Sequence, residues 1–95
     1  MTKKTKSINI DNINEIMKKY IIENFLPQAG LETFDDMDSF MEKGIIDSTG
    51  VLELLEFIEG KFEIKVEDEE VVPNNLDSLQ KLRQFIESKL AHAAQ

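Results

Sequence analysis

Among the side chains of this sequence, that of Ser48 is best placed for covalent chemistry, through its hydroxyl. Ser48 follows a long acidic connection and comes directly after Asp47, at the start of an apolar run that continues to Ile58. If that run is a helix, its positive N-terminal end would stabilise a phosphate group. Ser48 is therefore a candidate for carrying a phosphodiester. Spacing alone favours the other interpretation, a helix-capping serine, which stabilises a helix by about 1 kcal/mol.

Other kinds of chemistry find little support. The 95 residues contain no cysteine, and the one histidine, His92, lies in an alanine-rich C-terminal stretch. Without cysteine, neither a thiolate zinc site nor a disulfide can form. Asp36, Asp38 and Ser39 faintly resemble a calcium loop, but the glycine and glutamate that such a loop needs are missing. We therefore expect no catalytic residue and no metal site, and we predict that the chain is not an enzyme.

The charge is strongly acidic and uneven. The formal net charge is −8, and residues 32–70 hold fourteen acidic and three basic side chains. Such a surface repels phosphate backbones, which argues against nucleic acid as a partner. It would attract proteins with basic patches, although it could also be a solvated face that keeps the protein soluble. Because no apolar run approaches 18 residues, we expect no membrane insertion and a cytoplasmic location.

Apolar spacing predicts the first half of the fold. A stripe of apolar residues indicates a helix that begins near a cap at Asp11 or Asn12 and is ended by Pro27 and Gly30. Residues 27–46 then form a long connection, whose apolar side chains we expect to hold it across the core, with a short helical turn around residues 36–41.

The second half contains three more predicted helices. The second helix starts at residues 47–50, and Gly60 loosens or ends it; an alternating stretch over residues 62–66 follows. A brief third helix over residues 67–72 is stopped by Pro73. The fourth helix is capped by Asp77 or Ser78 and carries an apolar stripe to Leu90.

Together these elements predict an all-α fold, an antiparallel four-helix bundle with three main helices, one short helix and a long loop between the first and second. We expect one domain over residues 9–90, a flexible N-terminal tail over residues 1–8 and a C-terminal tail over residues 91–95. On the second helix, glutamates repeat at every third position and predict an acidic ridge: Glu53, Glu56 and Glu59.

The run Gly44-Ile45-Ile46-Asp47-Ser48-Thr49-Gly50-Val51-Leu52-Glu53-Leu54-Leu55 resembles the phosphopantetheine attachment motif of acyl and peptidyl carrier proteins. The resemblance continues through residues 57–69 and 79–86, so that it covers roughly residues 10 to 90. It implies the carrier fold, in which an Asp-Ser pair opens the second helix.

The resemblance also implies roles for particular residues. Ser48 would bear a covalent 4′-phosphopantetheine arm, and Asp47 would help the transferase to position its metal and coenzyme A. The three ridge glutamates would dock partner enzymes. Four apolar residues would line a pocket for the tethered acyl chain, unless they are simply core residues: Leu52, Leu55, Ile58 and Phe62.

Two positions depart from the fatty-acid type of carrier. The serine is followed by Thr49 and Gly50, where leucine and often an acidic residue are usual. Thr49 removes an apolar contact for partner enzymes, and Gly50 removes a charge and adds backbone freedom. This pattern is more similar to stand-alone carriers dedicated to one pathway, including the D-alanyl carrier group.

We therefore expect an acyl carrier protein that holds acyl groups as thioesters for fatty acid or specialised lipid or polyketide-type biosynthesis. Its expected partners are a phosphopantetheinyl transferase, an acyl- or aminoacyl-activating ligase, and downstream transferases or synthases with basic patches; we expect a monomer. One alternative is a D-alanyl or other aminoacyl or peptidyl carrier. An alternative of another class is an unmodified helical protein that acts as a structural or regulatory binding subunit.

Overall fold

The computed structural model describes residues 10–93, and three fifteen-residue helices make up most of that range. These are α1 (Ile10–Asn24), α3 (Ser48–Phe62) and α5 (Leu79–Ala93). Shorter elements lie between them: α2 (Leu26–Ala29), the 3₁₀-helix η1 (Asp68–Glu70) and α4 (Pro73–Leu76). No strand occurs between residues 10 and 93.

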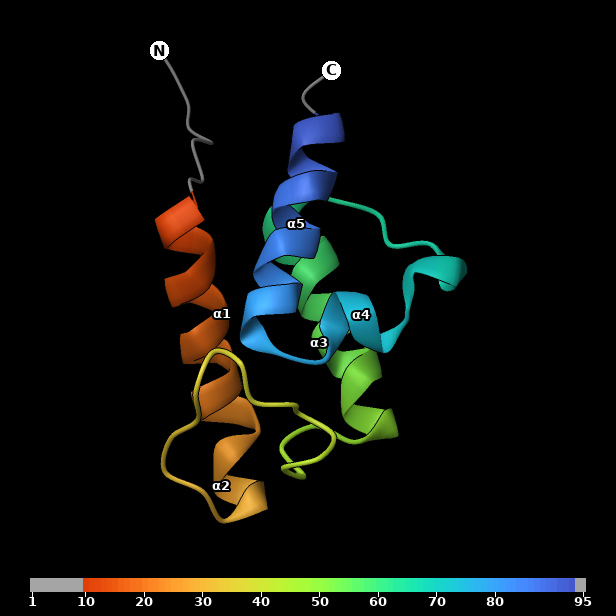
Figure 1. The fold of residues 1–95 in the computed structure, drawn as a ribbon. Helices are drawn as coiled ribbons and strands as arrows, with labels where there is room; N and C mark the ends of the chain where they lie inside the picture. Colours follow the sequence, from red (N-terminus) through yellow and green to blue (C-terminus); the bar gives the residue numbers. More distant parts are fainter. Residues whose placement is uncertain (1–9, 94–95) are drawn as a thin grey trace.

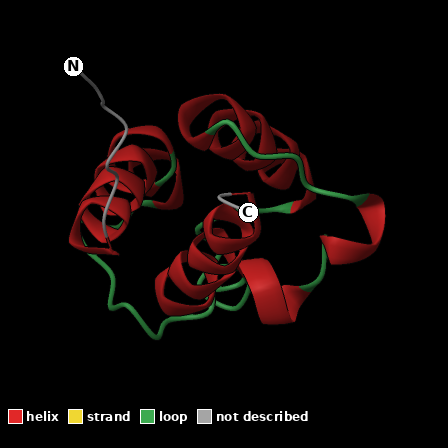
Figure 2. Ribbon diagram, turned by 90° about the horizontal axis from the view of Figure 1, so that it is seen from above, coloured by secondary structure: helices red, strands yellow, loops and turns green. Residues whose placement is uncertain are grey.

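The helix α1 runs in the opposite direction to α3 and α5, which run in the same direction as each other (Figure 1). Seen along the helices, the three long elements surround a shared interior, with α4 placed across its side (Figure 2). The predicted all-helical fold with three main helices, a short helix and a long loop is confirmed. The antiparallel relation holds for α1 only.

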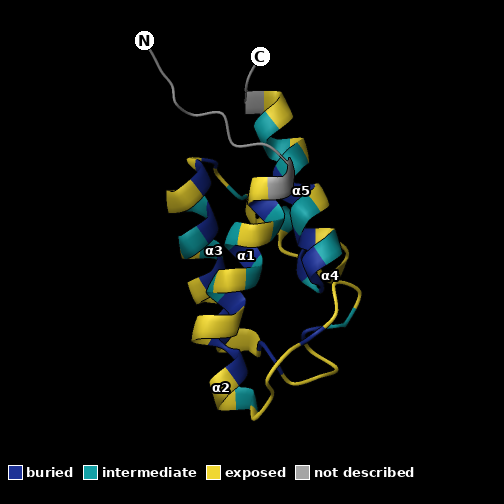
Figure 3. Ribbon diagram, turned by 90° about the vertical axis from the view of Figure 1, so that its left-hand side faces the viewer, coloured by how far each residue is buried: buried dark blue, intermediate teal, exposed yellow. Residues whose placement is uncertain are grey.

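The core lies where the three long helices face one another, as the inward dark-blue surfaces in Figure 3 show. Each long helix places fully buried side chains there, among them Met17, Leu54 and Leu82. The long loop adds further buried apolar residues to this core: Phe34, Phe40, Ile45 and Ile46. The expectation that apolar side chains hold the loop across the core is therefore confirmed for these four.

The first helix differs at both ends from the prediction. It begins at Ile10, so Asp11 and Asn12 lie inside it rather than capping it. Pro27 does not end α1; it lies in the first turn of α2, where a missing N–H group costs nothing. Gly30 does end a helix, because it caps α2 with a left-handed φ of 74°.

The predicted ends of the second helix and of the short helix also need correction. Gly60 lies inside α3, which continues to Phe62, because the buried Ile58 and Phe62 on either side outweigh the weak helix preference of glycine. Pro73 begins α4 instead of stopping a helix, since proline suits the first helical position. The predicted helix over residues 67–72 is reduced to η1.

In the loop, residues 36–41 contain turns rather than a helix. Of the two predicted caps of α5, Ser78 takes that role, because its Oγ accepts a hydrogen bond from the N–H of Lys81 at 3.1 Å. Asp77 bonds to the long loop instead.

The predicted tails fall mostly outside the described residues. Residues 1–8 lie wholly outside them, whereas α5 extends to Ala93 and so includes the first part of the predicted tail over residues 91–95. Within residues 10–93, every helix is too short or too polar to cross a membrane.

Candidate functional site

Ser48 is exposed and is the first residue of α3. The cap of this helix is Asp47, whose backbone is extended and whose Oδ1 accepts a hydrogen bond from the N–H of Gly50 at 2.8 Å. Within residues 10–93, the structure shows no hydrogen-bond partner for the Ser48 hydroxyl. The interpretation of Ser48 as the capping residue is therefore corrected, and its oxygen is available at the surface.

The end of the long loop holds this serine in place. The N–H groups of Ile45 and Ile46 both bond to the carbonyl of Phe40, at 2.8 and 3.3 Å. Both isoleucine side chains are buried, and Gly44 before them turns the chain with a φ of 70°. The two buried residues anchor the chain directly before Asp47, so that α3 starts at a defined point with Ser48 facing solvent.

Gly50 is buried where α3 passes close to Phe25. A Cβ atom at this position would lie 2.9 Å from Cε1 of Phe25 and 3.1 Å from Cγ2 of Ile46. Real Cβ atoms essentially never lie within 3.0 Å of such an atom, so any larger residue would push the aromatic ring or the helix aside. Glycine is therefore required here by the close approach of Phe25, rather than for the backbone freedom inferred from the sequence.

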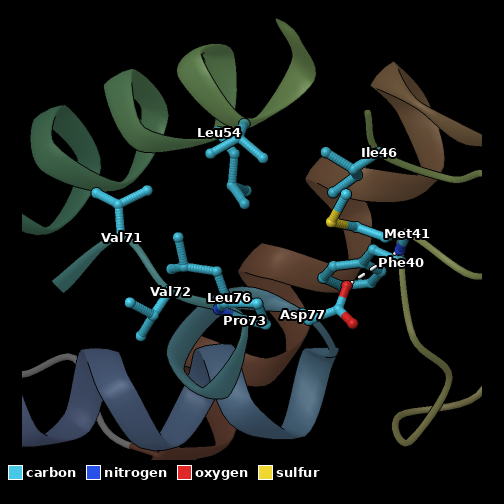
Figure 4. Close-up of a pocket in the computed structure, with 10 residues that line it drawn as sticks. Phe40, Met41, Ile46, Leu54, Val71, Val72, Pro73, Leu76 and Asp77 are labelled. Atoms are coloured by element: carbon cyan, nitrogen blue, oxygen red, sulfur yellow. Dashed lines mark hydrogen bonds between the residues drawn. The ribbon is translucent and has the colours of Figure 1, made fainter. Parts of the chain in front are cut away.

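An apolar cavity of about 120 Å³ lies beside the start of α3 (Figure 4). It is open on one side and is lined by α3, the long loop and the segment that contains α4. Its walls are nearly all apolar: Phe40, Met41, Ile46, Val51, Leu54, Val71, Val72, Pro73, Leu76 and Asp77. Ile46 and Val51 are two and three residues away from Ser48 in the chain. The cavity therefore lies close to the exposed serine.

The four residues predicted to line a pocket do not line this cavity. Leu52 is 65% exposed, Leu55 is half-buried at the edge of the core, and Ile58 and Phe62 belong to the core itself. The residues of α3 that do line it, Val51 and Leu54, lie one turn before Leu55 and Ile58 on the same side of the helix. Sequence reasoning missed them because the opposite wall comes from residues 71–77, whose position no helical periodicity reveals.

A second hollow, of about 240 Å³, lies on the other side of the start of α3 and is mainly polar. From α3 and its cap it is lined by Asp47, Thr49, Gly50 and Glu53, and across from them by Gln28 and Gly44 together with Phe25, Ala29 and Ile45. The first turns of α3 therefore separate an apolar cavity from a polar hollow.

The predicted acidic ridge contains two free glutamates rather than three. Glu53 and Glu56 are exposed, whereas Glu59 is partly buried and its Oε2 accepts a hydrogen bond from the N–H of Val66 at 2.8 Å. Residues three apart on a helix are offset by about 60° around its axis, so the third glutamate has turned towards the neighbouring segment. Glu59 therefore has a structural contact that the spacing did not reveal.

Aromatic residues flank the two exposed glutamates. The rings of Tyr20 and Phe57 stack at 3.9 Å between centroids, and the Tyr20 hydroxyl donates to the carbonyl of Glu53 at 3.3 Å. Burial, followed by the nearby charges of Glu53 and Glu56, raises the pKa of Tyr20. This contact ties α1 to α3 beside the glutamates.

Across residues 10–93, no group of three or more acidic or histidine side chains is arranged to hold a metal ion. The one described histidine, His92, is exposed on α5, with its Nδ1 2.8 Å from the carbonyl oxygen of Ser88.

Comparison with known proteins supports the fold. No protein-family model matches the chain, and no curated protein matches it in sequence. Among solved structures, the acyl carrier protein from Thermotoga maritima is similar, with a TM-score of 0.61 and 28% sequence identity. The match covers 85% of this chain and 94% of that one. The resemblance to the acyl carrier proteins is thus confirmed at the level of the three-dimensional structure.

Proposed function

Because the chain has the fold of an acyl carrier protein, we propose that it is a carrier whose Ser48 is modified with 4′-phosphopantetheine. The observation that carries this proposal is the exposed Ser48 hydroxyl at the start of α3, which Asp47 leaves free by capping the helix itself. When bound, the arm supplies a terminal thiol that holds a cargo as a thioester. The chain itself would catalyse no reaction.

The geometry at Ser48 suits a phosphodiester. The carboxylate of Asp47 accepts a hydrogen bond from the N–H of Gly50, and its carbonyl accepts one from the N–H of Val51. The N–H groups of Ser48 and Thr49 have no partner among the described residues. These two donors and the positive end of the fifteen-residue helix favour a negatively charged group.

The modification would be carried out by a phosphopantetheinyl transferase. The Ser48 oxygen would form a bond to the phosphorus of coenzyme A next to the pantetheine, with release of the adenosine bisphosphate and loss of the hydroxyl proton. Asp47, which resembles the family's aspartate at this position, would help the transferase to orient its metal and coenzyme A. This use of coenzyme A is consistent with a cytoplasmic location.

The exposed pair Glu53 and Glu56 lies one to two turns from Ser48 and would attract basic patches on partner enzymes. Besides the transferase, these partners would be an acyl-activating ligase and the synthases or transferases that use the cargo. Glu59 would contribute less than the other two, because Val66 already binds its carboxylate.

The apolar cavity next to Ser48 favours an acyl cargo over an aminoacyl one. Its walls are aliphatic and aromatic, with Asp77 as the one charged residue among them, and the carboxylate of Asp77 is bonded to the loop. This supports our proposal that the carrier serves fatty acid or specialised lipid or polyketide-type synthesis. The polar hollow with Asp47 and Glu53 favours the second candidate, a D-alanyl or other aminoacyl carrier, because its carboxylates would attract an ammonium group.

The test is co-expression with a phosphopantetheinyl transferase of broad specificity, followed by the mass of the intact protein. The proposal predicts one added phosphopantetheine in the wild type and none in Ser48→Ala. No added mass, in conditions that modify a known carrier, would contradict it and favour an unmodified structural or regulatory subunit.

A further inference from the structure

Asp77 connects the two opposite walls of the apolar cavity. It follows α4, and three successive loop residues bond to it. Its Oδ2 accepts from the hydroxyl of Ser39, its Oδ1 accepts from the N–H of Met41 at 3.0 Å, and its carbonyl accepts from the N–H of Phe40 at 3.1 Å. Figure 4 shows Asp77 facing Phe40 and Met41 at one end of the cavity.

These bonds fix a segment that has no regular structure of its own. Residues 30–47 contain turns but no helix, so their position depends on contacts with the rest of the fold. Ser39 extends this hydrogen-bond network, because its Oγ also accepts a hydrogen bond from the N–H of Glu42 at 3.1 Å. Phe40 and Met41 form one wall of the cavity, and Pro73 and Leu76 of α4 form the facing wall. The distance between the walls is therefore set where Asp77 joins them.

The cavity is small for a fatty acyl chain. An apolar cavity of about 150 Å³ holds a benzene molecule, so the space of about 120 Å³ here suits about four to six carbon atoms. Met41 lines the cavity and is 55% exposed, so it lies at the outer edge. A longer chain could enter only if the loop moved away from α4.

We propose that Asp77 is a positioning residue that sets the length of acyl chain the carrier can enclose, an inference that rests on the proposed attachment of the arm to Ser48. With the three hydrogen bonds in place, short chains are enclosed and long chains project into solvent. When the carboxylate is removed, only the backbone bond from Phe40 remains, so that the loop can move away from α4 and the cavity accepts longer chains.

The experiment has one readout without cargo and one with it. In the unmodified protein, amide hydrogen exchange at Phe40 and Met41 reports whether the loop is held. In protein loaded with hexanoyl- or dodecanoyl-phosphopantetheine from the corresponding coenzyme A thioester, the rate of cleavage by hydroxylamine reports how well each chain is enclosed. The quantity compared between variants is the ratio of the dodecanoyl rate to the hexanoyl rate.

In the wild type we expect slow exchange at both amides and cleavage of the dodecanoyl form at least about threefold faster than of the hexanoyl form. Asp77→Ala should accelerate both exchange rates and slow cleavage of the dodecanoyl form, so that the ratio of cleavage rates comes close to one. Asp77→Asn should keep the wild-type values, because its amide can accept a hydrogen bond from Met41 and donate one to Ser39. Asp36→Ala is the matched control: it removes an exposed loop carboxylate that lacks a hydrogen bond among the described residues.

A wild-type ratio in Asp77→Ala would overturn the inference, and so would a ratio that falls only because hexanoyl cleavage is faster, since either result would leave Asp77 with a purely structural role. If Asp77→Ala does not fold, Ser39→Ala removes one of the three hydrogen bonds and is judged by the same ratio. Failure of the wild type to accept any arm is a separate result, seen in the intact mass before hydroxylamine is added, and it would contradict the proposed function instead.

Discussion

The carboxylate of Asp47 caps α3 through the N–H of Gly50, 2.8 Å away, and the adjacent Ser48 makes no such bond. The two residues of the Asp-Ser pair therefore have separate roles. Asp47 stabilises the start of the helix, and Ser48 presents a free hydroxyl at its surface. A serine that capped the helix would have its oxygen occupied.

This division of roles predicts different costs for two neighbouring alanine substitutions. Asp47→Ala should lower the free energy of unfolding by about 1 kcal/mol, because the N–H of Gly50 loses its acceptor. Ser48→Ala should change it by less than about 0.5 kcal/mol, as expected for an exposed residue without a partner. Urea denaturation followed by circular dichroism measures both. Equal losses would show that Ser48 shares in the cap.

Two glycines of α3 offer a second matched pair. Gly50→Ala should destabilise the protein by about 1–3 kcal/mol, because its Cβ would meet the buried ring of Phe25 at 2.9 Å. Gly60→Ala meets no atom within 4 Å and should stabilise the protein by about 0.5–1 kcal/mol through higher helix propensity. Thermal unfolding of the two variants checks the signs, and a stabilised Gly50→Ala would contradict the packing described here.

An ion pair should make stability depend on acid pH. Glu70 accepts from Lys89 at 2.9 Å and from the N–H of Glu67, and both bonds lower the pKa of Glu70 below its ordinary value of 4.5. A carboxyl whose pKa is lowered on folding stabilises the fold above its unfolded pKa, and loses that contribution as the pH falls through the folded pKa.

Glu70→Gln should therefore be less stable than the wild type at pH 7, and the difference should shrink as the pH falls below 4.5. The midpoint of thermal unfolding from pH 7 down to pH 3 measures it. Exposed Glu69, which has no ion pair among the described residues, provides the control Glu69→Gln. A difference between wild type and Glu70→Gln that persists at pH 3 would contradict the assigned role of the ion pair.

The exposed pair Glu53 and Glu56 should govern encounter with the transferase. Glu53→Lys and Glu56→Lys should each lower the rate of modification at limiting protein several-fold, with a smaller effect at high salt, because exposed charges act mainly on association. Glu23→Lys on α1 is the control, with the same charge change at another exposed position. Equal effects of all three substitutions would show that the net charge of the protein, rather than a docking surface, controls the rate of modification.

Helical periodicity was sufficient to predict most of the fold. The three long helices, the long loop and its buried apolar anchors follow from spacings such as Leu79, Leu82 and Ile86, which recur on one face. Helix ends were less predictable, because they depend on tertiary contacts. Pro73 reads as a helix stop in isolation, yet it starts α4, and Gly60 stays helical because Ile58 and Phe62 are buried beside it.

At the candidate site, the sequence indicated Asp47 and Ser48 as candidates. It did not show that Asp47 caps the helix while the hydroxyl of Ser48 stays free. The cap depends on the extended backbone of Asp47, which is set by the buried Ile45 and Ile46 before it. The cavity could not be predicted from α3 alone, because half of its wall comes from residues 71–77. Glu59 looked equivalent to Glu53 in the sequence, and only the contact with Val66 distinguishes them.

The central claim is that the hydroxyl of Ser48 receives the arm, and Thr49 provides a hydroxyl at the next position as an internal control. The most direct test treats purified protein with coenzyme A and a phosphopantetheinyl transferase, digests it, and locates the added group by fragmentation of the peptide that contains both residues. The account predicts one phosphopantetheine per chain, all of it on Ser48. An unmodified peptide beside a modified control carrier, or a group on Thr49 or elsewhere, would contradict it.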